Sequence, residues 1–462
     1  MTDTVLKRQE DSFVVHAAAE PPIGQTDHDV AASTVRAISW RFMPLLTGCF
    51  IAAYIDRVNV SFAALTANRD LGLSASQFGW GAGLFFVGYF LAETPSNFIM
   101  TKIGARRWFS RIMVSMGVVA GATAFVTSPY EFYGARFLLG CCEAGLLPGV
   151  ILFLRGWVPK ALRAQFMGTF LLAIPLSSVI GAPISGALLE LDGLFGLKDW
   201  QIMFVLEALP CVILGGLVLL FLTETPDEAS WLSLEQKAWL RGRFLEEKKE
   251  AEGSLHREAN RSWMILLDAR VLAFGFAFFG ALCGSYGITL WLPQIVKAFG
   301  VTSAMNGFVT AIPFVFGSFA TIIIARRSDR TRERVWHVAG PALVAAAGLA
   351  LASIVASPFL MMTAVSLAAI GLFGLRGTFF ALVSERFSED NAPLGIAAIG
   401  AYSSLAGLIG PWVVGLLKDA TGSFVPGMMF LAVMSLASAA TLLLNRRLGV
   451  SSIPVRIAEP AG

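Results

Sequence analysis

Charged residues are scarce in this chain of 462 residues, at 15% of the total. Soluble proteins carry about 25% charged residues, so much of this surface must face something other than water. The net charge of +3 is too small to indicate a nucleic-acid partner. The five cysteines lack metal-ligand spacing and are interpreted as small packing residues. Histidine is also rare. Its four copies lie in the tail, the linker and a loop edge, which argues against histidine-based catalysis or a metal site in a helix interior: His16, His28, His256 and His337.

Long apolar runs make up most of what is present. Many reach the roughly 20 residues that a helix needs to cross a bilayer. Their apolar residues are continuous rather than alternating, which argues against membrane β-strands. The sequence therefore predicts an all-α membrane protein with twelve transmembrane helices, over residues 38–65, 77–100, 108–128, 132–157, 164–189, 201–223, 270–296, 304–325, 336–356, 358–385, 394–417 and 424–445.

A long polar insert divides these segments into two groups of six. It covers residues 224–269 and is interpreted as a solvated, partly helical linker between two six-helix bundles, 38–223 and 270–445. Residues 1–37 lack the apolar core and cleavage site of a secretory signal and are interpreted as a cytoplasmic tail. Residues 446–462 form the second tail.

The basic residues of the short loops predict the orientation. Lysine and arginine favour the cytoplasmic side. Loops after odd-numbered segments carry only Arg69, Lys198, Lys297 and Lys418, whereas loops after even-numbered segments and their flanks carry three times as many. We therefore expect a multi-pass protein of the cell (inner) membrane with the linker and both termini in the cytoplasm.

An internal repeat is visible. Three pairs of similar residues share one separation of 228 positions: Lys102 and Arg330, Arg106 and Arg334, and Pro183 and Pro411. Three matches at one offset indicate duplicated halves. Parallel repeats of this kind occur in transporters, which place their site between the halves near mid-membrane.

Seven longer stretches read YIDRVNVSFA (54–63), GYFLAETPSNFI (88–99), ARFLLGCCEAGLLPGV (135–150), AIPLSSVIGAPISGALL (173–189), WLPQIVKAFG (291–300), SDRTRERVWH (328–337) and GPWVVGLLKDATGSF (410–424). In them the chain resembles the major facilitator superfamily, and most closely its anion:cation symporter family, in the bacterial branch of tartrate, phthalate and hydroxyphenylacetate carriers. The resemblance implies a monomeric, non-enzymatic carrier of the major facilitator fold. It would need no cofactor, and a proton gradient would drive import of a small organic anion such as an aromatic or aliphatic carboxylate or a sugar acid.

Ionisable residues inside predicted spans cost roughly 2.5–3.5 kcal/mol each and so mark a pathway, and four of them form two pairs. These are Asp56 and Arg57 in the first span and Arg136 and Glu143 in the fourth. Arg136 and Glu143 are seven positions apart and share a helix face, about 10 Å apart. A carboxyl in such a place can load and release a proton, and the pairs could equally be structural bridges between helices. The resemblance implies proton handling by Asp56 and Glu143 and anion binding by Arg57, with Arg136 a further candidate for the anion.

Aromatic residues are candidates for orienting the substrate. Tyr54 and Tyr89 match tyrosines that the family uses near its substrate, although packing would also explain them. Trp291 is interpreted as a wall of the cavity, with an interface anchor as the alternative.

Segment ten is where the chain departs from its relatives. Arg376 precedes a stretch that usually reads G-P-F-W, and is either a snorkelling residue or a second anion contact. Gly400 and Ser404 replace common asparagines, which favours a less hydroxylated anion over a sugar acid. Glu93 is interpreted as a packing or gating residue. Glu207 has no obvious partner in the sequence.

The basic loops have a mechanical interpretation. By resemblance they hold the conformational lock of the superfamily, which closes the cytoplasmic side, although plain positive-inside charge would account for some of them. The residues concerned are Lys102, Arg106, Asp329, Arg330 and Arg334.

The sequence disfavours two other classes of function and leaves two open. An intramembrane enzyme would need a histidine or serine constellation that no span offers. A channel would need a filter or symmetric rings of charge. An exporter of small organic compounds and a non-transporting nutrient sensor stay open, because the direction of transport rests on the resemblance alone.

Overall fold

A computed structural model describes residues 25–254, 267–387 and 392–445. These residues form helices and connecting turns, without a strand. Eleven helices among them are long and apolar enough to cross a membrane. The twelfth span, α5, has 29 residues, contains the polar stretch 93–97 and is not among these eleven.

In chain order the spans are α2 with α3 (Gln25–Val58 and Val60–Ala63), α5 (Ala75–Ile103), α6 with η1 (Ala105–Ala122 and Thr123–Phe125), α7 with α8 (Pro129–Glu143 and Leu146–Arg155), α9 with α10 (Lys160–Leu171 and Ala173–Leu188), α11 (Asp199–Phe221), α13 (Ala269–Lys297), α14 (Ser303–Thr331), α15 (Trp336–Ile354), α16 (Pro358–Arg386), α17 with α18 (Ala392–Ser404 and Ala406–Thr421) and α19 (Val425–Leu444). Short connectors are α4 (Ala67–Asp70), η2 (Leu194–Gly196) and η3 (Pro226–Glu228), and α12 (Leu234–Ser254) follows the sixth span.

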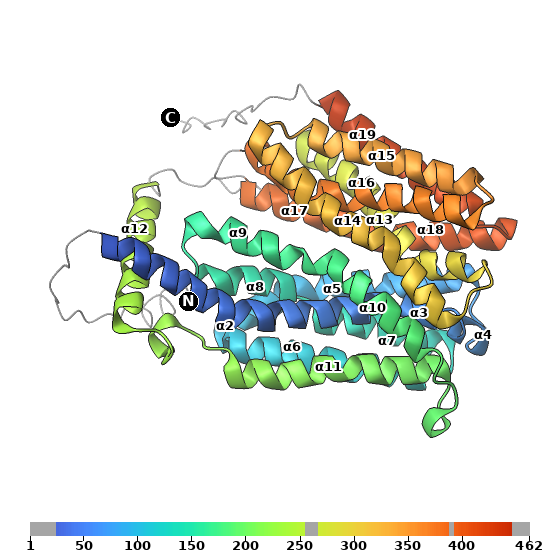
Figure 1. The fold of residues 1–462 in the computed structure, drawn as a ribbon, viewed down its shortest axis with the longest axis horizontal. Helices are drawn as coiled ribbons and strands as arrows, with labels where there is room; N and C mark the ends of the chain where they lie inside the picture. The colour runs from blue at the N-terminus through green and yellow to red at the C-terminus, as the bar shows by residue number, and fades with distance from the viewer. Residues whose placement is uncertain (1–24, 255–266, 388–391, 446–462) are drawn as a thin grey trace, which may run out of the picture.

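The fold prediction of twelve helices in two bundles is confirmed. Helices α2 to α11 form one group and α13 to α19 the other (Figure 1). The first helix differs from its predicted start near residue 38, because it begins at Gln25 and so includes part of the predicted tail. Residues 1–24 and the predicted tail 446–462 lie outside the described residues.

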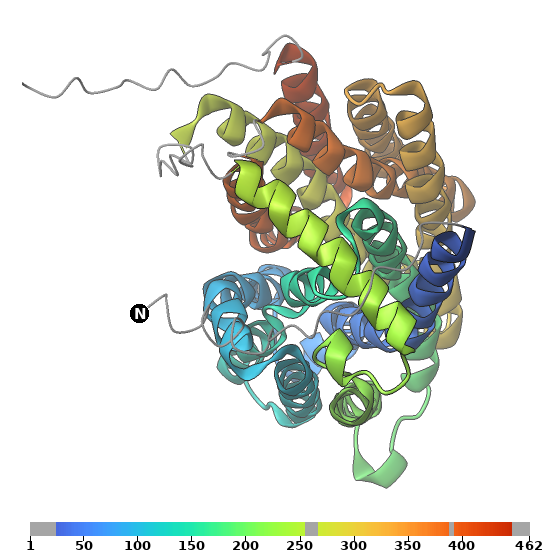
Figure 2. The ribbon, with the colours of Figure 1, turned by 90° about the vertical axis from the view of Figure 1, so that its left-hand side faces the viewer.

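The two ends of the molecule differ. One end carries α12 and the start of α2, and we call it the linker face (left in Figure 1). Seen from this side, α12 lies across the molecule (Figure 2). Gln236 at its start donates a hydrogen bond to the Ser33 hydroxyl over 3.1 Å, which ties α12 to α2. The opposite end carries α3 and α4, and we call it the closed face.

At the closed face the bundles touch through a symmetric pair of glycines. A Cβ on Gly79 would lie 2.5 Å from the carbonyl oxygen of Pro411, and one on Gly307 would lie 2.9 Å from the Cα of Pro183. Gly79 and Gly307 are separated by 228 positions, as are the two prolines. The repeat in the sequence therefore corresponds to two equivalent backbone contacts between the bundles.

Two carboxylates complete this contact by capping helices of the other bundle. Asp419, at the end of α18, accepts hydrogen bonds from the Ser74 hydroxyl (2.9 Å) and from the amides of Ala75 (3.0 Å) and Ser76 (2.8 Å) at the start of α5. Glu190, which follows α10, accepts one from the amide of Ala304 (3.0 Å) at the start of α14. Helix N-termini favour negative charge, so both caps hold this face shut.

Several spans are broken in mid-course. The first breaks at Asn59, and the fourth breaks between α7 and α8, where Gly145 adopts a φ of +93°. The hydroxyl of Ser96 donates to the freed carbonyl of Ala144 over 2.6 Å. Irregular backbone at membrane depth is tolerated only inside the protein or beside a cavity. Glu143 is the last residue of α7, so both breaks flank the ionisable residues singled out in the sequence.

Candidate functional site

An ion pair joins the two broken spans. Arg57, one residue before the end of α2, donates through Nη2 to Oε1 of Glu143. The Glu143 side chain is 2% exposed and that of Arg57 is 13% exposed. The second carboxylate oxygen of Glu143 has no hydrogen-bond partner within the described part of the chain. The pair is therefore buried, and Glu143 keeps a free site for a proton.

Aromatic rings surround the Arg57 guanidinium. Its Cζ atom lies 5.2 Å from the ring centre of Tyr54, 5.0 Å from Phe85 and 5.4 Å from Tyr89. A cation over an aromatic face gains about 0.5–2 kcal/mol, most where water is excluded. The two predicted tyrosines thus lie at this arginine, and Phe85, which the sequence analysis missed, completes the cage.

Arg136 lies behind this cage. It is 1% exposed, and its Nη2 donates to the backbone carbonyl of Arg57 over 3.1 Å. Its Cζ lies 5.4 Å from the Phe85 ring. Although it shares α7 with Glu143 as expected, the carboxylate pairs with Arg57 and not with Arg136. Arg136 therefore positions Arg57, and the structure gives it no exposed surface for an anion.

Asp56 points away from its neighbour Arg57. Its Oδ2 accepts a hydrogen bond from the Cys211 thiol of α11 over 3.1 Å, and Oδ1 has no partner among the residues described. Successive residues of a helix point about 100° apart, which separates the two side chains. Asp56 is thus buried inside the first bundle, and Cys211, predicted only to pack, is also its hydrogen-bond donor.

Arg376 of the second bundle lies near the aromatic cage around Arg57. Arg376 donates through Nη2 to the Ser285 hydroxyl of α13 over 2.5 Å, and its Cζ lies 4.8 Å from the Phe373 ring. It also lies within electrostatic range of Tyr54 in the first bundle. It is ten residues, about 15 Å, from the end of α16 and does not snorkel to the linker face. No carboxylate pairs with it in the described ranges.

Tyr286 of α13 is a further aromatic residue that the sequence analysis missed. Its ring centre lies 4.5 Å from that of Phe86 on α5, so the two bundles meet here through aromatic rings. Tyr286 also interacts electrostatically with Arg57. Its position one residue after Ser285 on a glycine-rich helix would have been the available signal.

Trp291 lies apart from the arginine cluster. It is 1% exposed, donates from Nε1 to the carbonyl of Pro411 over 3.1 Å, and packs edge-on against Phe78 at 5.2 Å. These partners belong to the closed face. The structure therefore places Trp291 in the seal between the bundles, and its contacts do not support the predicted role as a wall around the anion.

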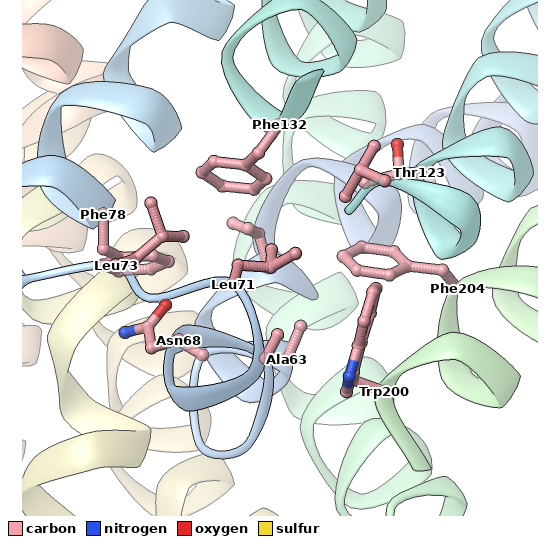
Figure 3. Close-up of a pocket in the computed structure, with 13 residues that line it drawn as sticks. Ala63, Asn68, Leu71, Leu73, Phe78, Thr123, Phe132, Trp200 and Phe204 are labelled. Carbon is pink, nitrogen blue, oxygen red and sulfur yellow. The ribbon is translucent and has the colours of Figure 1, made fainter. Parts of the chain in front are cut away.

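A small pocket near this seal is lined by apolar side chains. It lies between α3, α4 and the ends of neighbouring helices (Figure 3). Asn68 and Thr123 are its only polar residues and neither is charged. A pocket of this composition offers nothing to hold an anion, so we do not assign the substrate to it.

The basic loop residues pair within their own bundles. Arg106 donates to the carbonyl of Leu219 over 2.5 Å, and its amide donates to Glu224 over 2.8 Å. The Lys102 ammonium lies 4.3 Å from the Phe98 ring centre.

The corresponding loop of the second bundle is similar. Arg334 forms ion pairs with Asp329 (2.6 Å) and Glu385 (3.0 Å), and these partners hold the pKa of Arg334 above its usual value despite partial burial. Arg330 lies in the last turn of α14. Within the described ranges, these hydrogen bonds and ion pairs each stay inside one bundle and do not join the two.

The arrangement has a clear chemical consequence. An ionised Glu143 competes with any other anion for the Arg57 guanidinium, and a proton on Glu143 removes that competitor. Arg376 faces the same region, and its described neighbours there are the Ser285 hydroxyl, the Phe373 ring and Tyr54 of the first bundle. Groups of three or more potential metal ligands do not occur in the part of the chain that the structure describes.

Comparisons with known proteins agree with the fold. The family model "Major Facilitator Superfamily" matches residues 45–411 and 274–454. A "Putative tartrate transporter" of Agrobacterium vitis is 43% identical over 94% of this chain and 96% of its own length. A "Quinolone resistance transporter" of Acinetobacter baumannii is 38% identical over 88% of this chain and 94% of its own length.

Among solved structures, a bacterial homologue of the human lysosomal transporter Spinster, inward-facing and occupied, aligns with a TM-score of 0.69 at 17% identity. The alignment covers 88% of this chain and 97% of that one, and shows the fold alone. The name of the tartrate transporter fits the anion:cation symporter branch that the motifs indicated, and the chain is a multi-pass membrane transporter and not an enzyme. It belongs to the Major Facilitator Superfamily.

Proposed function

We propose that this transporter is a proton-coupled symporter that imports a small organic anion by alternating access. The observation that carries the proposal is the buried ion pair between Arg57 and Glu143. The relative named as a tartrate transporter supports an organic acid as the substrate. Because tartrate is hydroxylated, hydroxy acids belong in the substrate panel beside the less hydroxylated acids favoured by Gly400 and Ser404.

Competition for one guanidinium provides the coupling. When Glu143 is ionised, it occupies Arg57 and the anion is excluded. When Glu143 is protonated, Arg57 is free to bind a carboxylate, with Tyr54 and Tyr89 orienting it. Proton and anion therefore load together and leave together, which is symport. Asp56 would respond to the same change, because it lies within electrostatic range of Glu143.

The two faces provide the alternation. The contacts at the closed face hold the bundles together there, and the lock residues of the linker face pair within their bundles. We infer that this conformation opens toward the linker face, which the basic loops assign to the cytoplasm. In the opposite conformation Lys102, Arg106, Asp329, Arg330 and Arg334 would close the linker face.

The test uses purified protein in proteoliposomes with radiolabelled tartrate as the first probe. Glu143→Gln should abolish uphill accumulation driven by a pH gradient and leave counterflow exchange. Glu131→Gln is the matched control, because Glu131 lies exposed in the first turn of the same helix. Normal accumulation by Glu143→Gln would contradict the mechanism.

Export is the second candidate, favoured by the relative named as a quinolone resistance transporter. Quinolones carry a carboxylate, so the same arginines would serve. Outward movement of a quinolone against its gradient, without uptake of any carboxylate in the panel, would assign export. Binding without movement of any ligand would indicate a sensor.

A further inference from the structure

A second group of buried polar residues lies inside the first bundle, away from the arginine cage. It joins α11 to the break in the first span. Glu207 and Cys211 lie four residues apart on one face of α11, and Asp56 and Asn59 lie three apart on the opposing helix. All four are at most 5% exposed. They face one another as two rungs, Asp56 with Cys211 and Asn59 with Glu207.

Glu207 is held by neutral groups only. Ser185 of α10 donates to its Oε1 over 2.6 Å, and the Asn59 amide faces it. Its Oε2 and both amide atoms of Asn59 lack a hydrogen bond of good geometry to any described residue. Glu207 has no ion-pair partner among residues 25–254, 267–387 and 392–445.

The surroundings of Glu207 explain why no cation reaches it. Helix α6 packs on α11 at this level through Gly117 and Gly121, which meet Ala208. The α6 residue Arg111 lies nearer the linker face and donates to the carbonyl of Cys142 over 3.2 Å. The charged group that does act nearby is Asp56, which has the same sign as an ionised Glu207.

An ionised carboxylate in such a place is strongly unfavourable, because burial removes its hydration and no cation replaces it. A proton on Oε2 removes the charge from this buried oxygen, which has no hydrogen-bond partner among the described residues. The geometry calls for a proton at this site in the conformation described here.

The position of the cluster connects it to the transport site. Asn59 is the residue at which the first span breaks, and it follows Arg57 by two positions. Asp56 precedes Arg57 directly and lies in electrostatic range of Arg136, which holds the Arg57 carbonyl. Loss of the proton would place a charge beside this break, and rearrangement of the break would move Arg57.

We propose that Glu207 is a further proton-binding carboxyl of the transport cycle, distinct from Glu143, which Asn59 and Asp56 link to Arg57. The proposal rests on the proposed proton symport. It assigns one proton per cycle to Glu207, taken from water on one side and released on the other, in addition to the proton on Glu143.

The first measurement needs no substrate. An infrared difference spectrum of the purified protein between acid and neutral pH reports the carbonyl band of protonated carboxyls. Glu207→Gln should remove one titrating band, and Glu207→Asp should keep one with a shifted midpoint. Glutamine still accepts from Ser185, so the variant should fold, and an unchanged Tm checks this. A difference spectrum identical to that of the unmodified protein would overturn the proposal.

The second measurement counts protons in proteoliposomes with tartrate as the probe. With a gradient of one pH unit, each coupled proton raises the limiting accumulation about tenfold. Glu207→Gln should lower the limiting accumulation about tenfold and keep pH-driven uptake. Glu143→Gln should lose pH-driven uptake altogether, because anion binding at Arg57 then no longer depends on a proton. Equal accumulation by Glu207→Gln and the unmodified protein would overturn the inference alone. Absence of pH-driven uptake in the unmodified protein would refute the symport of tartrate, while the infrared band still decides whether Glu207 binds a proton. Dependence of uptake on Na⁺ that Glu207→Gln abolishes would assign the site to a metal cation instead.

Discussion

Removal of the Asp419 carboxylate should loosen the closed face as a whole. Asp419 accepts three hydrogen bonds of 2.8–3.0 Å from the first turn of α5, which belongs to the other bundle. The amides of Ala75 and Ser76 have no partner inside their own helix, because the first N–H groups of any helix lack one. Loss of a capping side chain costs about 0.5–2 kcal/mol, and its charge at a helix N-terminus adds about 0.3–1 kcal/mol.

We therefore expect Asp419→Ala to destabilise the closed arrangement by roughly 1–2 kcal/mol, which is a factor of about 5–30 in its population relative to the open one. Hydrogen exchange followed by mass spectrometry measures this opening without labels. The peptide that covers the start of α5 should exchange about 5 to 30 times faster than in the unmodified protein.

The decisive comparison is the other cap. Glu190 still accepts from Ala304 at the start of α14 in this variant. If the bundles move as rigid bodies, opening at one cap opens the other, and the α14 peptide should also exchange faster. Faster exchange confined to α5 would show that Asp419 is only a local cap, and this reasoning would be refuted. Glu190→Ala is the matched variant for the reverse experiment.

Three further predictions concern single side chains. Arg57→Ala should weaken tartrate binding by roughly 30-fold or more, because a buried charged hydrogen-bond partner is lost. Calorimetry on the purified protein measures the affinity, and an unchanged affinity would remove Arg57 from the site. Arg376→Gln should raise the KM for transport and keep pH-driven accumulation. Accumulation should persist because Arg376 has no carboxylate partner in the described ranges and so takes no part in the proton exchange. Lost pH coupling with an unchanged KM would contradict this. Asp70→Asn should lower the Tm near neutral pH, because the hydrogen bond from Lys198 holds the pKa of Asp70 below its usual value. The stabilisation that ionised Asp70 contributes is lost as the pH falls through that lowered pKa, so the difference in Tm between the variant and the unmodified protein should vanish in acid. A difference in Tm that persists at low pH would be a packing effect.

The spans could be predicted closely, because continuous apolar runs and the polar loops between them are both visible in the sequence. Helix α16 was expected over 358–385 and is observed at Pro358–Arg386. The start of α2 was not predicted, because the polar stretch before residue 38 has no apolar periodicity and its helix continues into the span. Helical propensity and contact with α12 act there instead of burial in lipid.

The sequence was enough to predict which residues form the candidate site, but not which of them pair with each other. Arg57, Glu143 and the two tyrosines were identified because charges and hydroxyls are rare in apolar spans. Sequence spacing suggested Arg136 as the partner of Glu143, since they share one face of α7. The observed partner is Arg57, because the tertiary fold brings its guanidinium, near the end of α2, to Glu143 at the end of α7, and a tertiary contact of this kind leaves no local pattern in the sequence.

Helix geometry is enough to predict that the side chains of Asp56 and Arg57 have different surroundings, because neighbours on a helix point about 100° apart. The role of Trp291 in the seal could not be predicted from the sequence. Its indole donates to a carbonyl in another span of its bundle, and its ring packs on Phe78 from the other bundle, so the contact depends on how the bundles dock.

The two halves share the contacts that cap helices of the other bundle, but not the buried ion pair. Glu190 and Asp419 are 229 positions apart, as are Ala75 and Ala304 within the helix starts that they cap, so the duplication preserved one cap in each half. The ion pair between Arg57 and Glu143 has no such counterpart among the ion pairs described for the second bundle. Changes in the repeated caps should therefore alter import and exchange together, because both need the same rocking motion. Changes in the unrepeated pair should separate import from exchange, because only net import needs the proton to leave.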